Sequence, residues 1–268
     1  LANNYGPSYG SAEETFGQIM KSSFAPYRDE LFISTKAGHD MWPGPYGNWG
    51  SRKHLMASLD QSLKRMNLDY VDVFYSHRYD PETPLEETLQ ALVDIVRKGK
   101  ALYVGLSKYP LDAYLFACRY LKERDVPCLL YQGRYSMLVR EPESQGILNA
   151  VKENGSGFVA FSPLAQGLLT NRYLNGIPAD SRIARGGFLK KEALTPEVLS
   201  KIQALNERAA IRGQSLAEMA LAWLLKNETV TSVIVGASSV EQLGDSLKTL
   251  NHLSFEEEEL HAIEKMLM

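Results

Sequence analysis

Six short β-rich runs, each followed by a helical pattern, constrain the fold of this chain more than any other feature. Most of the runs are nearly continuous apolar stretches, as is typical of parallel strands buried on both faces. They occupy residues 31–36, 71–77, 101–107, 128–132, 157–162 and 231–236. Because parallel neighbours need a crossover connection, the alternation predicts an α/β fold with right-handed strand–helix–strand units.

The helical patterns between these runs carry clear start and stop signals. Residues 51–66 begin at Ser51, a plausible N-cap, and contain an apolar stripe at spacings of four, four and three. Residues 84–99 have proline first, acids in the opening turn, bases in the last turn and glycine at the end. Further helices are expected at residues 11–23, 111–124, 144–154, 196–212, 215–226, 240–250 and 256–267.

Two architectures fit this pattern, an open doubly wound sheet and a closed barrel. An open dinucleotide-binding sheet should show G-x-G-x-x-G at its first strand–helix turn, and none is present. Nearly every strand instead ends on a chemically capable side chain: Lys36, His77, Ser107, Gln132 and Ser162. Barrel enzymes collect their active sites from such strand ends. We therefore predict a (β/α)8 TIM barrel forming a single domain over residues 1–268, with its first one to two strands expected before Leu1.

Composition narrows the class of protein. The 268 residues carry a net charge of −3 with no Lys/Arg run, which argues against nucleic-acid partners, and no apolar run is long enough to insert into a membrane. The two cysteines, Cys118 and Cys128, lack metal-ligand spacing and fit packed thiols in a cytoplasmic protein. Oligomeric state stays open, with a homo-oligomer among the alternatives.

Six segments occur in the order and approximate spacing of the aldo-keto reductase superfamily, and the chain resembles that family over essentially its whole length. They are LANNYG, ISTKAG, VDVFYSHR, GLSKY, FSPLAQGLL and IVGASSVEQL. The first two, with the residues that follow them, look most like the bacterial L-glyceraldehyde-3-phosphate reductase branch, to which the β subunits of voltage-gated potassium channels are related. The resemblance implies an enzyme that reduces a small carbonyl substrate with a nicotinamide cofactor.

By this resemblance, Tyr5, Lys36 and His77 match the family's catalytic tyrosine, lysine and histidine, and the family's aspartate would fall immediately before Leu1. Hydride transfer to a carbonyl develops negative charge on oxygen, which must be stabilised and then protonated. A free phenol has a pKa of about 10, and a neighbouring ammonium such as Lys36 would lower the pKa of Tyr5. A neutral His77 could donate a hydrogen bond to the carbonyl oxygen.

The same resemblance supplies the expected cofactor contacts. Ser107 and Gln132 match residues that bind the nicotinamide carboxamide, and Phe161 matches an aromatic that stacks on the ring. Expected phosphate contacts come from backbone donors and side chains at Ser162, Leu164, Gln166, Gly167, Arg172 and Gly236.

Ser238, Gln242 and Ser246 match positions that contact the adenosine 2′-phosphate and adenine. Two residues depart from the branch: Ser239 replaces an arginine and Ser246 an asparagine. We expect NADPH as the cofactor, with NADH as the alternative, because the serine-rich helix start remains while the charge is lost.

Alternatives remain at three points. A cofactor-sensing protein with slow turnover, like the channel subunits, would keep the same three residues. Residues 39–52, with their aromatic side chains, could line a substrate pocket or pack on themselves. Residues 171–194 could close over bound cofactor as a strap or form an exposed connection.

Overall fold

The computed structural model describes residues 1–179, 181, 183–184, 186 and 189–268. The chain forms two compact units. The first comprises Leu1–Gln132 and Asn149–Gly157, and the second comprises Gly133–Leu148 and Phe158–Met268. Asp180, Arg182, Arg185, Gly187 and Phe188, within the predicted strap or connection, lie outside the described residues.

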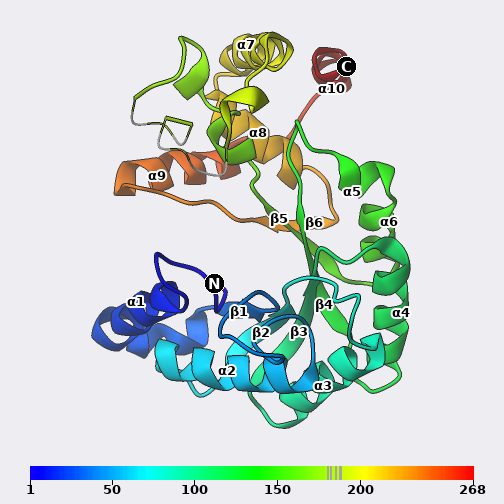
Figure 1. Cartoon of the computed structure of the whole chain (residues 1–268). Coiled ribbons are helices and arrows are strands. Elements are labelled where there is room, and N and C mark those ends of the chain that lie inside the picture. Colours follow the sequence, from blue (N-terminus) through cyan, green and yellow to red (C-terminus); the bar gives the residue numbers. More distant parts are fainter. Residues whose placement is uncertain (180, 182, 185, 187–188) are drawn as a thin grey trace. The chain divides into compact units, whose positions relative to one another are not determined.

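Four parallel strands in chain order build the first unit. They are β1 (Ser34–Ala37), β2 (Val71–Ser76), β3 (Ala101–Ser107) and β4 (Cys128–Arg134). Helices of this unit include α1 (Ser11–Ile19), α2 (Arg52–Met66), α3 (Leu85–Arg97) and α4 (Leu111–Lys122). Figure 1 shows α2, α3 and α4 on the outside of these strands. Strand, crossover helix and next strand therefore follow one another as predicted.

The best-predicted helix shows why the pattern worked. The Ser51 hydroxyl accepts a hydrogen bond from the His54 amide, so the predicted N-cap is confirmed. The four residues of the apolar stripe are all buried: Leu55, Leu59, Leu63 and Met66. Burial of such a stripe contributes on the order of 1.5–3 kcal/mol per side chain, which is enough to fix this face of α2 toward the sheet.

The chain departs from prediction after α1. The α-helix ends at Ile19 and continues as a π-helical turn, Met20–Phe24, and a 3-10 turn, Ala25–Glu30. β1 then begins at Ser34 rather than at residue 31. The predicted helix over residues 144–154 is two short helices, α5 (Glu141–Ser144) and α6 (Ile147–Glu153). Gly146, at φ 76°, ends the first of them because that backbone conformation favours glycine.

In the second unit β5 (Gly157–Phe161) pairs in parallel with β6 (Val230–Val233). β6 is shorter than predicted, since residues 234–236 lie beyond it, and it is largely exposed. Among the described residues β6 has a strand partner on one side only, which fits the exposure of Thr231 and Ser232. The helices are α7 (Pro196–Ile211), α8 (Leu216–Leu225), α9 (Val240–Lys248) and α10 (Glu257–Leu267).

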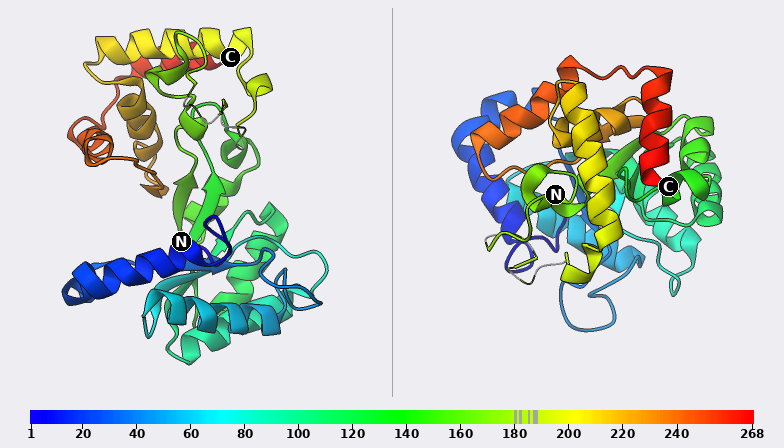
Figure 2. Two further views of the ribbon diagram at one scale, coloured as in Figure 1. Left: turned by 60° about the vertical axis from the view of Figure 1, so that its left-hand side comes forward. Right: turned by 90° about the horizontal axis from the view of Figure 1, so that it is seen from above.

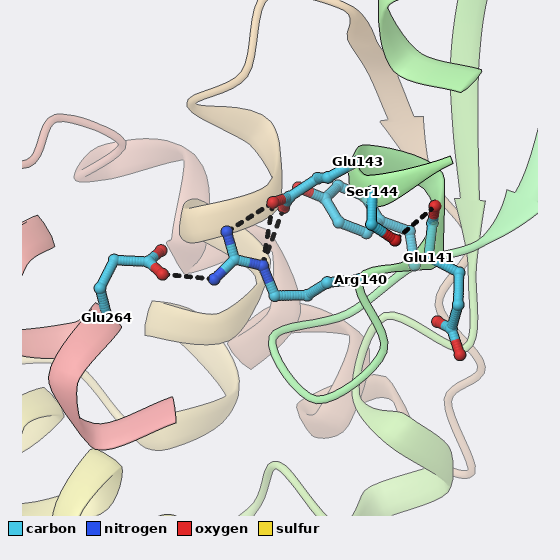
Figure 3. Close-up of polar contacts among 6 residues, drawn as sticks. Arg140, Glu141, Glu143, Ser144 and Glu264 are labelled. Carbon is cyan, nitrogen blue, oxygen red and sulfur yellow. Dashed lines mark hydrogen bonds and ion pairs between the residues drawn. The ribbon is translucent and has the colours of Figure 1, made fainter. Parts of the chain in front are cut away.

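One arginine ties the elements of the second unit together. Arg140 pairs with Glu143 of α5 and with Glu264 of α10, both at 2.5 Å (Figure 3). Its guanidinium also lies 5.1 Å from the Trp223 ring of α8. The Tyr135 hydroxyl donates to Glu143 from the other side. Helices α7 and α10 run side by side, as Figure 2 shows. This cluster fixes the segment after β4 onto the helical layer of the unit.

The architecture is the alternating strand–helix arrangement of a (β/α)8 barrel, with six strands in the described part of the chain. Within each unit the strands are parallel and neighbours in space are neighbours in sequence. No helix in the described ranges combines the length and the apolar character that a bilayer crossing requires.

Candidate active site

Tyr5 reaches Lys36 because the first residues of the chain run alongside β1. The Leu1 amine donates to the Ser34 carbonyl at 3.0 Å, and the Asn3 amide donates to the Lys36 carbonyl at 2.9 Å. A turn closed by the Tyr5 amide and the Ala2 carbonyl then points the chain away from the sheet edge. The loop residue and the strand lysine are therefore held together by main-chain hydrogen bonds.

The structure brings the three predicted catalytic residues together in the first unit. Lys36 Nζ lies 5.4 Å from the centroid of the Tyr5 ring, and the Tyr5 and His77 rings meet edge to face at 5.7 Å. The His77 amide donates to the Ala37 carbonyl, which sets the histidine directly after β2 beside the lysine strand. Lys36 and His77 are buried, whereas Tyr5 is exposed over 43% of its surface. An acid, a cation and a hydrogen-bond donor thus face one small region.

Burial and surrounding cations keep His77 neutral. Its pKa is lowered to about 2, first by burial and then by Lys36 and other cationic neighbours. Burial also lowers the pKa of Lys36 to about 8, with Lys108 acting in the same direction and Glu13 opposing it. A neutral imidazole carries a single N–H, so His77 can serve as a donor to a carbonyl oxygen at neutral pH.

The pKa of Tyr5 differs from the sequence-based expectation. Burial raises the pKa of this phenol, whereas a neighbouring lysine was expected to lower it. The ammonium of Lys36 lies near the ring centroid, where it attracts the π electrons. In this arrangement the lysine does not offset the cost of burying a phenolate. The phenol is therefore fully protonated at neutral pH and available as a proton donor.

Two histidines with lowered pKa values, the buried His77 and the half-buried His39, predict that the fold is sensitive to acid. The pKa of His39 is lowered to about 4 and that of His77 to about 2, against about 6.5 in an unfolded chain. Below about pH 6.5 the unfolded chain binds protons that the folded chain does not, so the free energy of unfolding should fall as pH decreases. Urea denaturation at about pH 7.5 and about pH 5 measures the loss. His77→Gln should lose less than the parent, and an equal loss in both proteins would contradict this origin.

Ser107 and Gln132, the expected carboxamide contacts, are paired neighbours on β3 and β4. Both are buried, and Gln132 hydrogen-bonds the Tyr75 hydroxyl, whose ring lies 5.7 Å from Lys36 Nζ. Among the residues that the structure describes, Ser107 Oγ is buried without a hydrogen-bond partner, as are both side-chain polar atoms of Asn3. Unpaired buried polar groups are costly, so such atoms in one unit fit a site that awaits a polar ligand group such as a carboxamide.

The expected phosphate loop lies in the second unit, directly after β5 and Phe161. Ser162, Ala165, Gln166 and Gly167 all have positive φ, so the loop is a tight left-handed turn. Successive peptide groups in such conformations can form anion-binding concavities. The Gly167 amide donates internally to the Leu164 carbonyl at 2.8 Å, so it would contact a phosphate only if this turn opened.

Arg172 and the residues around the start of α9 complete the predicted set in the second unit. Arg172 is exposed on a short 3-10 turn, Asn171–Tyr173, and Gly236 lies between β6 and α9. The Ser239 hydroxyl caps α9 by accepting from the Gln242 amide. The Gln242 side chain accepts from both the amide and the hydroxyl of Ser238, and Ser246 donates to the Gln242 carbonyl. The three predicted adenosine contacts therefore lie along α9 at spacings of four residues, from just before its start to its last turn.

Four charged or titratable neighbours of the catalytic residues were missed by sequence reasoning: Glu13, His39, Arg78 and Lys108. Glu13 is fully buried and accepts hydrogen bonds from Thr35 and Arg65. In sequence it looks like an ordinary acid in the first turn of a helix. The other three each follow a strand end, the signal that found Lys36 and His77, and that signal could have identified them too.

A pocket of about 290 Å³ lies in the second unit between α7 and α10, beside Lys201 and Glu264. None of the residues predicted for the site lines it. The catalytic residues are therefore identified by their side-chain chemistry and mutual placement and not by this cavity.

Comparison with known proteins identifies the family of the chain. The sequence profile of the aldo/keto reductase family matches residues 1–268. The chain is 55% identical to L-glyceraldehyde 3-phosphate reductase of Escherichia coli K12 over 270 residues, which covers 99% of this chain and 78% of that protein. It is 37% identical to a probable voltage-gated potassium channel subunit beta of Arabidopsis thaliana over 248 residues, 90% of this chain and 74% of that protein. The chain therefore belongs to the aldo/keto reductase family, and it is an oxidoreductase.

Proposed function

We propose that this chain reduces small aldehydes and ketones to alcohols with NADPH, and that residues 1–268 act as a single reductase domain. The observation that carries the proposal is the cluster of Tyr5, Lys36 and His77. The family match over the whole chain and the 55% identity to an enzyme named for a phosphorylated aldehyde support it.

Bound NADPH would supply the hydride. Ser107 and Gln132, with the unpaired buried amide of Asn3 nearby in the same unit, would hold the carboxamide and so orient the nicotinamide ring, on which Phe161 would stack. Phosphates would be bound by Arg172 and by backbone groups at Ser162, Leu164, Gln166, Gly167 and Gly236. Backbone N–H groups of the left-handed turn after β5, and the positive charge of Arg172, would thus be offered to the phosphates.

Tyr5 would donate the proton that the reduced oxygen requires. His77, held neutral, would donate a hydrogen bond to the carbonyl oxygen and orient it. Lys36 would place positive charge near the oxygen on which negative charge develops, which gives a reason for a buried lysine beside the Tyr5 ring. Since the pKa of Lys36 is about 8, this assistance should weaken in alkaline solution as the ammonium loses its proton.

Steady-state reduction of an aldehyde panel tests the proposal directly. Glyceraldehyde 3-phosphate, methylglyoxal and uncharged aldehydes would each be offered with NADPH, and consumption of NADPH followed by its absorbance. Turnover of at least one aldehyde at a rate ordinary for enzymes, on the order of 1 s⁻¹ or more, supports an enzyme. Tight NADPH binding without turnover would contradict it.

A second candidate, a cofactor-sensing subunit of a membrane protein, is favoured by the 37% identity to the plant channel subunit. Tyr5, Lys36 and His77 do not separate the two candidates. Slow turnover together with capture of a membrane partner would favour the second candidate, whereas fast turnover and no capture would favour the reductase.

Cofactor choice should depend on position 239. Ser239 caps α9 beside Ser238 and Gln242, and these groups offer only neutral donors to a 2′-phosphate. A hydrogen bond to a charged partner contributes roughly 1 kcal/mol more when the donor is itself charged, which is close to a factor of ten in binding. We expect the parent to prefer NADPH weakly and Ser239→Arg to prefer it about tenfold more.

The matched control is Ser239→Ala, which also removes the cap but adds no charge. Fluorescence titration of NADPH and NADH against the three proteins gives the dissociation constants. Equal affinities of the parent for the two cofactors would discard the NADPH assignment. An unchanged ratio in Ser239→Arg would show that position 239 does not face the 2′-phosphate.

A further inference from the structure

Three basic or titratable side chains surround the catalytic histidine in the first unit: His39, Arg78 and Lys108. Each follows the end of a strand, β1 for His39, β2 for Arg78 and β3 for Lys108. The predicted catalytic and cofactor roles use none of them. Residues at these strand ends form the active sites of barrel enzymes, so their chemistry bears on the substrate.

His39 connects the catalytic imidazole to Lys108. The His39 and His77 rings meet edge to face at 4.4 Å, and Lys108 Nζ lies 3.4 Å from His39 Nε2. Burial lowers the pKa of His39 to about 4, with Arg78 and Lys108 adding to the effect, so its ring is neutral and accepts from the ammonium. Lys108 is therefore held one imidazole away from the group that faces the carbonyl.

The backbone conformation at Lys108 indicates that this side chain is held in a particular place. Lys108 has φ 55°, an uncommon conformation for a residue with a side chain, and its amide donates to the Gln132 carbonyl. Non-glycine residues in this region cluster at functional sites, because surrounding contacts must compensate the strain. Here the Gln132 bond fixes the turn, and the exposed side chain returns toward His39.

Arg78 is a second cation with a fixed position. Its Nε donates to the Gly38 carbonyl at 2.8 Å, its Nη2 donates to Asn48 Oδ1 at 2.7 Å, and its guanidinium lies 3.7 Å from the Trp49 ring. It is half-buried, and burial lowers its pKa. These contacts use carbonyl oxygens and a π face and no carboxylate, so the charge of Arg78 stays uncompensated by them.

Two carboxylates, Asp40 and Asp80, lie near enough to Arg78 to oppose the lowering of its pKa by burial, so they offset part of its charge. Asp80 uses its oxygens to accept from the amides of Gly50, Glu82 and Thr83. Asp40, next to His39, is exposed. Lys36, Lys108 and Arg78 all lower the pKa of His77, as cations near its ring would. A dianion placed there would be attracted by these three cations, with Asp40 and Asp80 offsetting part of the attraction.

We propose that Lys108 and Arg78, with His39 as a neutral partner, form an anion subsite that binds the phosphate of a phosphorylated aldehyde whose carbonyl faces Tyr5 and His77. The subsite makes the enzyme select phosphorylated over uncharged aldehydes of the same length. This inference rests on the proposed function, since it assigns the substrate end of the same site. Arg78 supplies a rigid charge, and Lys108 a donor that can turn from His39 to the phosphate.

Lys108→Gln tests the subsite, and Lys122→Gln is the matched control, because Lys122 is an exposed lysine at the end of α4 in the same unit. With NADPH saturating, the ratio of kcat/KM for glyceraldehyde 3-phosphate to that for methylglyoxal should fall about tenfold or more in Lys108→Gln and stay at the parent value in Lys122→Gln. Lys108→Arg, which keeps the charge, should recover most of the ratio.

Inorganic phosphate is a direct probe of the same groups. It should inhibit methylglyoxal reduction by the parent competitively, and the inhibition constant should rise about tenfold in Lys108→Gln. Absence of phosphate inhibition in the parent, or equal behaviour of the two glutamine variants, would overturn the subsite. So would a loss of NADPH affinity in Lys108→Gln with phosphate inhibition retained, because that result places Lys108 on the cofactor.

A binding measurement distinguishes failure of the phosphate subsite from failure of the proposed reductase function. Trp49, beneath Arg78, makes tryptophan fluorescence a reporter of phosphate binding that needs no turnover. If the parent reduces no aldehyde, the proposed function fails, while a phosphate-dependent fluorescence change lost in Lys108→Gln would still support an anion site. If aldehydes are reduced but phosphate causes no change, only the subsite fails.

Discussion

Replacing Tyr5 with phenylalanine should lower kcat for aldehyde reduction by about 10² or more, because general-acid catalysis contributes ~10²–10⁴. The hydroxyl is the only group removed, and the ring keeps its edge contact with His77 and its place beside Lys36. Since burial keeps the phenol protonated at neutral pH, the parent has the proton that the variant lacks. Steady-state kinetics with NADPH saturating measures the loss.

Binding of NADPH to Tyr5→Phe is the control, read as quenching of protein fluorescence. The expected contacts to the cofactor use Ser107 and Gln132, which the substitution leaves alone. Tyr9→Phe removes a hydroxyl from an exposed tyrosine in the same loop region and should turn over like the parent. A Tyr5→Phe enzyme as fast as the parent would remove Tyr5 from the proton-donor role.

Glu13→Ala should cost about 3 kcal/mol of folding free energy, near the lower end of what removing one partner of a buried ion pair costs. The Glu13 side chain is fully buried, and its two oxygens accept from Arg65 Nε at 2.8 Å and Thr35 Oγ1 at 2.5 Å. The Arg65 side chain keeps 16% of its surface exposed, so water partly compensates the charge left behind. Urea denaturation of parent and variant gives the difference.

Glu14→Ala is the matched control, since it removes an exposed acid from the next position of the same helix and should change stability by less than about 0.5 kcal/mol. Glu13→Leu combined with Arg65→Leu should be milder than Glu13→Ala, because no charge is left unpaired. Equal losses in Glu13→Ala and Glu14→Ala would mean that the buried pair does not stabilise the fold.

Sequence periodicity correctly predicted those helices and strands whose bounds depend on a local signal such as an apolar stripe or an N-cap. The apolar stripe and N-cap of α2, and the apolar run of β3, led to bounds within one residue of those observed. Tyr5, Lys36 and His77 were found because each matches a family motif, and the structure places them together.

The remainder depended on contacts that no local pattern encodes. Glu13 reads as a surface acid until α1 packs on α2, where Gly17 lies so close that an added Cβ would meet the Arg65 carbonyl at 2.1 Å. The strand after residue 230 is short because pairing on one side only supports few residues of β6. The pKa of Tyr5 depends on where around the ring the ammonium lies, and spacing in sequence does not specify that.

Because the Asn3 amide donates to the Lys36 carbonyl, the distance between Tyr5 and Lys36 depends on whether the first residues stay paired with β1. A slip of one residue there would turn alternate side chains to the opposite face and move Tyr5 away from Lys36. A segment joined to a strand by few hydrogen bonds, such as those of Leu1 and Asn3, opens with a smaller free energy than a buried strand. Heat or mild denaturant would therefore separate the acid from its cation while the helices stay folded, and hydrogen exchange at the Asn3 amide would report that opening before circular dichroism changes.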